Sequence, residues 1–253
     1  MPDLVICLAT LAAQAAHLVF QDTDVPVLFG AVSDPVGAGI ANSLGSPTGT
    51  NVTGLALSIF REVKIDFVLS LLGPEQPDPV MIGAIHTSYP SDRGDLQALR
   101  DKAGPGGKLS FHSREIPYLD MPAGNDHMLA QVGPLVLELE EQVDFWWMLT
   151  SPLSELNEFM GIVSRNSNKP VLLGNNMDHV RSGALISVTG DYVAWGREMA
   201  EMAHQLLQGA DPGAIPVKPF SEYTVGVNLT TALSLGIVIP PEILRLAQGN
   251  VYR

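Results

Sequence analysis

The chain has 253 residues, of which 46% are hydrophobic and 16% charged, and this is the composition of a globular rather than a disordered protein. Lys and Arg number 14 against 27 Asp and Glu, so the formal net charge is −13. No excess of basic side chains is available to neutralise phosphates, which argues against nucleic acid as a partner and fits a small-molecule ligand. No apolar run approaches the length of a membrane-spanning helix, so we expect no direct membrane span.

Strand and helix patterns alternate along the chain with short connections, which is typical of an α/β fold with parallel sheets. The N-terminus predicts a strand at Leu4–Leu8 and a helix at Leu11–Val19, without the basic segment that begins a signal peptide. A buried strand follows at 25–32, after which Pro35 is placed to start a glycine-punctuated helix that Asp34 would cap. The other predicted strands are 51–57, 80–86, 108–112, 143–149, 170–173, 184–188 and 223–227, and the other predicted helices are 60–72, 91–102, 125–142, 152–164, 191–208 and 240–247.

A proline-rich stretch, Glu75–Pro79 after Gly73-Pro74, is the expected domain boundary. It predicts a small block at 1–74 and a fuller α/β block at 80–219, with residues 220–253 returning to the first block. The two blocks would each need their own sheet and core.

Motifs for chemistry are sparse. The six histidines are scattered without metal-ligand spacing, and the single cysteine, Cys7, is expected to pack in the core. No nucleophile elbow or Walker loop is present, so we expect no enzyme, no metal and no cofactor. The alternative is a nucleotide-dependent α/β enzyme that uses the turn Gly37-Ala38-Gly39, although the third glycine of such a fingerprint, Gly45, lies too far along.

Three loops place a capping side chain between a strand and a helix, namely Asp34-Pro35, Ser151-Pro152 and Gly190-Asp191. Each loop alone is explained by a helix N-cap worth about 1 kcal/mol. Their recurrence at the carboxyl ends of parallel strands, with Thr10 in a comparable place, indicates a ligand site there. Amide donors and acidic caps together suit an α-amino acid or a similar zwitterion.

Aromatic residues lie close to these strand ends. Trp146 and Trp147 alternate sides of a predicted strand, and packing in the core is favoured for either ring, with one outward-facing ring as the alternative. Tyr192 begins a helix. A ring at the wall of a pocket would suit an apolar or aromatic ligand side chain.

The run VPVLFGAVSDPVGAGIANSLGSPTGTNVTG at Val25–Gly54 resembles a block of the ABC-transporter substrate-binding proteins of the tryptophan/tyrosine-binding type. Later segments match the same family in order: Lys169-Pro170-Val171, Val180–Leu185, Gly190-Asp191-Tyr192, Gly196, Asn228–Ala232, Leu235-Gly236-Ile237 and Ile239-Pro240-Pro241. The resemblance covers nearly the whole chain.

This resemblance implies a type I periplasmic-binding-protein fold, in which two Rossmann-like lobes with parallel sheets close on a ligand. By matching position it places Thr10, Gln14, Ser33 and Asp34 in ligand-facing loops of the first lobe. The other lobe would contribute Thr150, Ser151 and Asp191. The implied function is capture of a small amino-acid-like ligand, aromatic amino acids included, by hinge closure for an ABC permease, in the periplasm or outside the cell.

Two departures from the family pattern stand out. Ser151 replaces an Asp that is common in the family, which removes a possible partner for an ammonium group. The chain starts at a strand that matches the third strand of family members, so we expect an N-terminally truncated first lobe that lacks its central strand and one wall of the pocket. A sensory or repressor-type ligand domain on the same fold would need a helix-turn-helix segment ahead of Met1, and we expect none.

Overall fold

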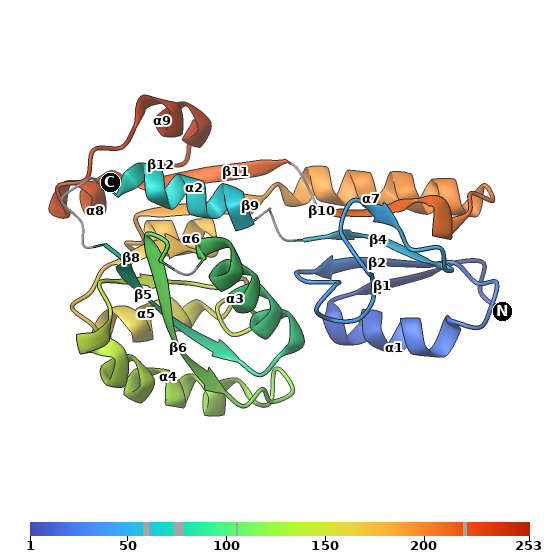
Figure 1. Cartoon of the computed structure of the whole chain (residues 1–253), viewed down its shortest axis with the longest axis horizontal. Helices are drawn as coiled ribbons and strands as arrows, with labels where there is room; N and C mark the ends of the chain where they lie inside the picture. Colours follow the sequence, from blue (N-terminus) through green and yellow to red (C-terminus); the bar gives the residue numbers. More distant parts are fainter. Residues whose placement is uncertain (58–60, 73–77, 105, 220–221) are drawn as a thin grey trace. The chain divides into compact units, whose positions relative to one another are not determined.

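The computed structural model describes residues 1–57, 61–72, 78–104, 106–219 and 222–253. The chain divides into two compact units (Figure 1). Unit 1 comprises Met1–Phe60 with Gly190–Tyr223, and unit 2 comprises Arg61–Thr189 with Thr224–Arg253.

This division differs from the expected one in three segments. Residues 61–72 belong to unit 2, the 190–219 segment belongs to unit 1, and the C-terminal segment from residue 224 belongs to unit 2. The reason is strand pairing, because β10 (Pro216–Pro219) pairs in parallel with β4 (Val52–Ala56) and so draws the helix before it into unit 1. The proline-rich stretch expected as the boundary lies largely outside the described residues.

Unit 1 is built on a five-stranded sheet in the order β1-β2-β4-β10-β3, in which only β3 runs antiparallel to its neighbour. Strand β1 forms one edge of this sheet, with Ile6 and Leu8 each 54% exposed. The other elements of unit 1 are α1 (Thr10–Phe20), α7 (Tyr192–Leu207) and η2 (Pro212–Ala214), and its remaining strands are β1 (Val5–Leu8), β2 (Val27–Val32) and β3 (Ser46–Pro47).

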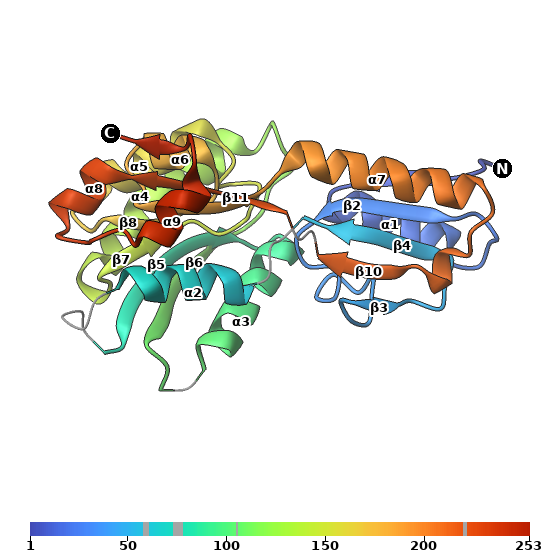
Figure 2. The ribbon, with the colours of Figure 1, turned by 90° about the horizontal axis from the view of Figure 1, so that it is seen from above.

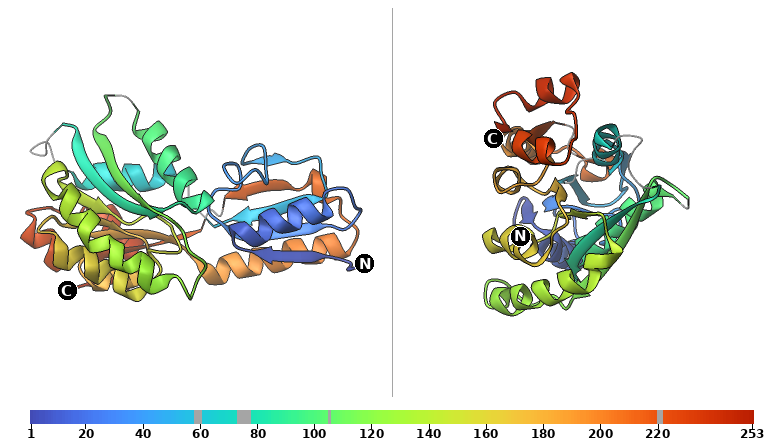
Figure 3. Two further views of the ribbon diagram at one scale, coloured as in Figure 1. Left: turned by 90° about the horizontal axis from the view of Figure 1, so that it is seen from below. Right: turned by 90° about the vertical axis from the view of Figure 1, so that its left-hand side faces the viewer.

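Helices cover both faces of the unit 1 sheet, as a parallel sheet requires. Phe29 packs with α1 on one face, whereas Leu28 packs with α7 on the other, so the apolar run of β2 is buried throughout. Figure 2 shows α7 lying over the strands, and Figure 3 shows α1 against the opposite face. Cys7 is buried on the α1 face, as expected, and burial raises the pKa of its thiol.

Unit 2 contains a seven-stranded sheet in the order β12-β11-β9-β8-β7-β5-β6, with parallel pairing from β6 through β9. Its strands are β5 (Val80–Thr87), β6 (Leu109–Ile116), β7 (Phe145–Trp147), β8 (Val171–Gly174), β9 (Ile186–Gly190), β11 (Tyr223–Asn228) and β12 (Val251–Tyr252). Its helices are α2 (Arg61–Leu71), α3 (Pro90–Ala103), α4 (Asn125–Leu139), η1 (Glu140–Gln142), α5 (Asn157–Asn166), α6 (Met177–Arg181), α8 (Leu229–Ser234) and α9 (Pro241–Ala247).

Both tryptophans of β7 are buried, each 1% exposed, which confirms core packing for either ring and excludes the alternative of an outward-facing one. Trp146 packs with α4 and α5, and its indole Nε1 donates to Ser167 Oγ at 2.7 Å. Trp147 makes an edge contact with the ring of Phe111, with centroids 5.5 Å apart. The physical reason is that helices cover unit 2's sheet on both faces (Figure 1), which leaves no outward side for a central strand.

One predicted helix is a series of turns instead, and another begins later than expected. After Asp34 the chain forms a series of turns through residue 39, because Gly37 and Gly39 carry little helix propensity and Gly39 adopts a φ of 72°. After Ser151 the chain also turns, and α5 begins only at Asn157. Both segments therefore present loops rather than helix ends at the places expected to face a ligand.

Candidate ligand-binding site

In unit 1 the side chains of Thr10, Ser33 and Asp34 gather at one edge of the sheet. Parallel β1 and β2 end together, since Leu8 pairs with Gly30 and Ala9 N donates to Gly30 O at 3.0 Å. Thr10 begins α1 directly after β1, and Ser33 and Asp34 follow β2. All three residues are at most 8% exposed. The carboxyl edge of a parallel sheet is where α/β proteins hold their ligands.

The Asp34 carboxylate organises the turn that follows it. Its Oδ1 accepts from Gly37 N at 3.0 Å, and a Cβ at Gly37 would lie 2.2 Å from Oδ2, so a larger residue there would displace the carboxylate. Gln14 donates from Nε2 to Ala38 O at 2.8 Å, which ties α1 to the same turn. A carboxylate lines this Gly-x-Gly turn, and in the described residues the turn does not lead directly into a helix. Because a phosphate group binds best at a helix N-terminus without a neighbouring negative charge, the geometry does not suit one.

Asp191 was expected in the same lobe as Ser151, but the structure places it in unit 1. Its carboxylate caps α7 by accepting from Val193 N and Ala194 N, each at 3.0 Å, and its own N–H donates to Glu222 O at 3.1 Å. The helix it starts packs on unit 1, which carries Asp191 to the same unit as Asp34. Tyr192 beside it is 52% exposed.

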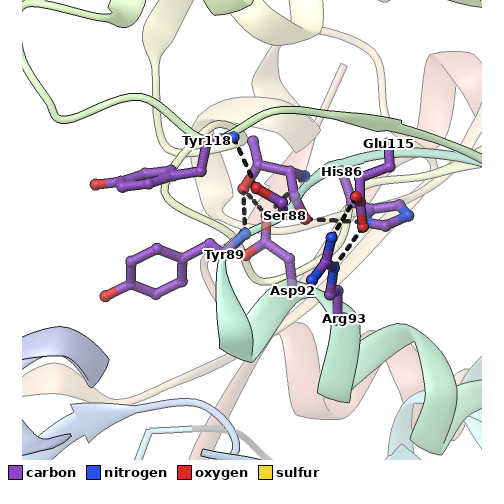
Figure 4. Close-up of polar contacts among 8 residues, drawn as sticks. His86, Ser88, Tyr89, Asp92, Arg93, Glu115 and Tyr118 are labelled. Atoms are coloured by element: carbon purple, nitrogen blue, oxygen red, sulfur yellow. Dashed lines mark hydrogen bonds and ion pairs between the residues drawn. The ribbon is translucent and has the colours of Figure 1, made fainter.

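In unit 2 the edge formed by β5 and β6 carries two tyrosines. Ser88 N donates to Ile116 O at 2.9 Å just beyond the paired strands, and Ser88 Oγ accepts from Tyr118 N at 2.9 Å. The rings of Tyr89 and Tyr118 lie 4.8 Å apart with a tilt of 59°. Figure 4 shows these rings projecting together, away from the ion pair of Arg93 and Glu115.

A buried carboxylate, Asp92, lies next to this edge. Its Oδ2 accepts from Thr87 N at 2.9 Å, from Thr87 Oγ1 at 2.7 Å and from Ser151 Oγ at 2.8 Å. Its Oδ1 is buried and has no hydrogen-bond partner among the described residues. Burial raises the pKa of Asp92 to about 6, against the opposing effect of the hydrogen bonds from Thr87 and Ser151.

Two buried cations of α2 lie in the same region of unit 2. Lys64, 5% exposed, donates from Nζ to Thr150 Oγ1 at 2.9 Å. Arg61 Nε contacts Asp95 Oδ1 at 3.1 Å, and both side chains are at most 10% exposed. Burial lowers the pKa of Lys64, and the charge of Asp95 opposes that effect. Thr150 and Ser151 are therefore both held by buried charged groups.

Two further groups lie next to the charged cluster formed by Arg61, Lys64, Asp92 and Asp95. His86 Nδ1 donates to Thr87 O at 3.0 Å, and burial lowers the pKa of its imidazole. Arg93 donates from Nε to Glu115 Oε2 at 2.6 Å on the exposed side, and this contact lowers the pKa of Glu115. These contacts appear as dashed lines in Figure 4.

Sequence reasoning missed the charged cluster and the tyrosine pair. Asp92 had an available signal, because it lies in the first turn of a predicted helix that follows a predicted strand, as Asp34 and Asp191 do. Arg61 and Lys64 had none, since charged residues on a predicted helix are normally solvated.

No group of His, Cys, Asp and Glu that could hold a metal is present in the described part of the chain. Within the same residues, no helix combines the length and the hydropathy needed to cross a membrane.

A family model described as ABC transporter substrate binding protein matches residues 1–92 and 128–251. The chain belongs to this family. The matched segments include the seven residues proposed from the sequence to face a ligand, and the α/β fold with two mostly parallel sheets is the type I periplasmic-binding-protein fold, as expected.

A curated relative is the tyrosine-binding protein of Clostridioides difficile (strain R20291), which is 29% identical over 236 residues. The match covers 92% of this chain and 63% of the relative, so this substrate-binding protein spans less than two thirds of the relative's length.

Two solved structures share the fold. One is an ABC domain from Streptococcus pneumoniae in complex with L-Trp, at 26% identity and a TM-score of 0.76, covering 99% of this chain and 81% of the other. The second is a conserved domain protein from Vibrio cholerae, at 25% identity and a TM-score of 0.76. The match covers 100% of this chain and 79% of the other.

Proposed function

We propose that this substrate-binding protein captures an aromatic L-amino acid, of the tyrosine or tryptophan type, and delivers it to the permease of an ABC importer. The observation that carries the proposal is the family match, which spans the segments holding Thr10, Asp34 and Thr150. The names of the relatives, a tyrosine-binding protein and an L-Trp complex, support the ligand class. The family is one of binding proteins, so we propose no reaction.

The polar groups at the two sheet edges suit a zwitterion. In unit 1 the buried carboxylate of Asp34 would attract an ammonium group, with Thr10 and Ser33 beside it. In unit 2 the hydroxyls of Thr150 and Ser151 lie at the carboxyl edge, and we propose that closure of the two units about a hinge brings the two sets to one ligand. Gln14 and Asp191 would act through the turn and the helix that they hold.

The tyrosine pair supports an aromatic ligand. Tyr89 and Tyr118 stand at the same edge of unit 2 as Ser88, and ring–ring contacts add about 0.5–1.5 kcal/mol beyond the burial of area. We further propose a periplasmic or extracellular location, where importers of this kind collect their ligands.

The test is thermal shift followed by calorimetry with each of the twenty amino acids. A ligand at a hundred times its Kd adds about 2.7 kcal/mol to the stability of the folded state, so L-tyrosine or L-tryptophan should raise the melting temperature by several degrees. A folded sample that no amino acid stabilises would contradict the proposal. Stabilisation by ATP or NAD instead would favour the enzyme reading of the Gly37-Ala38-Gly39 turn.

A pair of variants sharpens this test. Asp34→Asn should weaken amino-acid binding at least tenfold, because it removes the charge opposite the ammonium group. Asp211→Asn is the matched control, since Asp211 accepts from Gly213 N at 2.9 Å in a similar turn of unit 1, before β10. Equal losses from both variants would mean that Asp34 acts through the stability of its turn.

A further inference from the structure

We propose that the buried charges of Lys64 and Asp92 set the direction of two hydroxyl groups, so that Thr150 offers a hydrogen-bond donor and Ser151 an acceptor. The carboxylate of a zwitterionic ligand would then face Thr150, and its ammonium group would face Ser151. This inference rests on the proposed function and deepens it, because it concerns how the amino and carboxyl groups of the ligand are told apart.

Thr150 is oriented by a cation. An ammonium group has three protons and no lone pair, so Lys64 Nζ, 2.9 Å from Thr150 Oγ1, uses that oxygen as an acceptor. The hydroxyl proton of Thr150 is therefore directed away from Lys64. Because Thr150 is only half-buried, its proton can be offered to an anion, and the positive charge behind it strengthens that attraction.

Ser151 is oriented by an anion. Asp92 Oδ2 already accepts from a backbone N–H, that of Thr87, which can only donate, so this oxygen acts as an acceptor. Ser151 Oγ, 2.8 Å away, then commits its proton to Asp92 and also accepts from Leu153 N at 3.1 Å. Ser151, which is 4% exposed, could then meet a ligand only as an acceptor, through its remaining lone pair, and this suits an ammonium group.

The loop itself is held in place, so the two directions persist. Ser154 Oγ donates to Leu149 O at 2.6 Å and lies 3.0 Å from Ser151 O, which closes the loop on itself. The cost of this arrangement indicates a function, because Asp92 is buried with one carboxylate oxygen unpartnered in the described chain, and such burial is unfavourable for folding.

Several charged and titratable groups lie on the helix of Asp92 and on the elements around it. On its own helix these are Asp95, which opposes its ionisation, and Arg93. The packed elements contribute Arg61 and Lys64 from α2, His86 from β5, and Glu115 from β6 with Tyr118 beyond its end. Burial lowers the pKa of His86, which also carries a titratable imidazole, so a variant of Asp92 is needed to assign any pH effect.

The experiment compares three probes that differ only in their charged groups: L-tyrosine, tyramine, which lacks the carboxylate, and 3-(4-hydroxyphenyl)propanoate, which lacks the ammonium group. The corresponding indole compounds are used if L-tryptophan binds more tightly. Lys64→Met should weaken L-tyrosine and the propanoate at least tenfold and leave tyramine within twofold. Asp92→Asn should weaken L-tyrosine and tyramine at least tenfold and leave the propanoate within twofold.

A pH series adds a readout that a merely structural role would not move. For the wild-type protein the Kd for L-tyrosine should rise about tenfold for each pH unit below 6, as Asp92 becomes protonated, while the Kd for the propanoate stays level. The Asp92→Asn variant should lose this dependence. If it keeps the dependence, His86 or another group is responsible and the inference is wrong.

Second variants keep the inference testable if the first ones do not fold. Should Lys64→Met fail to fold, Thr150→Val must reproduce the pattern expected of it, and Ser151→Ala must reproduce that of Asp92→Asn. Equal loss of affinity for all three probes would overturn the inference and leave the proposed function standing. No binding of any probe by wild-type protein would overturn the proposed function, and this inference with it.

Discussion

Replacing Asp92 by Asn should change how the stability of unit 2 depends on pH. Asp92 has a pKa of about 6 in the folded protein, against 3.8 for an unperturbed Asp, because burial disfavours its charge. The folded state therefore prefers the protonated form, and the resulting stability is fully present below about pH 4 and is lost as the pH rises through 6. A pKa difference of about two, at about 1.4 kcal/mol for each pH unit, corresponds to about 3 kcal/mol.

Asparagine cannot ionise, so the Asp92→Asn variant should not lose stability as the pH rises through 6. Between pH 4 and pH 7.5 the unfolding free energy of the variant should rise by about 2.5 kcal/mol relative to that of the wild type, since a small part of the full effect already lies below pH 4. Taking the difference between the two pH values cancels any fixed cost of burying the new amide. The same variant is expected to bind an amino acid less well, so stability and binding would change in opposite directions.

The assay is urea unfolding at several pH values, followed by the fluorescence of Trp146 and Trp147, which report on the core of unit 2. Asp101→Asn is the matched control, since Asp101 is an exposed carboxylate on the same helix that accepts from Gln97 at 2.8 Å. Its difference from the wild type should not change with pH. If the difference for Asp92→Asn also stays constant within about 0.5 kcal/mol, the argument from a buried charge is refuted.

Three further experiments test packing, capping and ion-pair contacts. Gly30→Ala should destabilise unit 1 by about 1–3 kcal/mol in thermal melts, because its Cβ would lie 2.7 Å from the ring of Trp195; an unchanged melting temperature would contradict that packing. Asp191→Ala should cost about 1 kcal/mol through loss of the α7 cap, and Asp191→Asn should recover most of it. Arg61→Met should cost about 3–5 kcal/mol in urea unfolding, since it leaves Asp95 buried without its partner, and adding Asp95→Leu should restore much of the loss.

Local patterns in the chain were sufficient to predict most strands and helices. The apolar run at 25–32 forms β2, and the three-and-four spacing after Asp191 forms α7 with its predicted cap. Such elements follow from residues that are close in the chain, so periodicity and capping chemistry report on them directly. The helix predicted after Asp34 is replaced by turns, and the one predicted after Ser151 begins only at Asn157, because glycines, prolines and turn hydrogen bonds outweighed the capping signals.

Part of the candidate site could likewise be predicted from the sequence, and part of it could not. The side chains at the ends of strands were found from the sequence, because a polar residue after a buried strand in a parallel sheet has a predictable place. Whether those residues bind a ligand stays a prediction. The buried partners of Thr150 and Ser151 were not found, since Lys64 and Asp92 lie 86 and 59 residues away from them along the chain.

The sequence by itself determined the alternation of strands and helices and the family block around Asp34, and it predicted a small-molecule ligand. Only the tertiary structure decided which segments share a sheet, as when β10 pairs with β4 and carries Asp191 into unit 1. It also decided that the hydroxyls of Thr150 and Ser151 lie against opposite buried charges. The reason is that hydrophobic periodicity depends on neighbouring residues, whereas strand pairing and buried ion contacts join residues far apart in the chain.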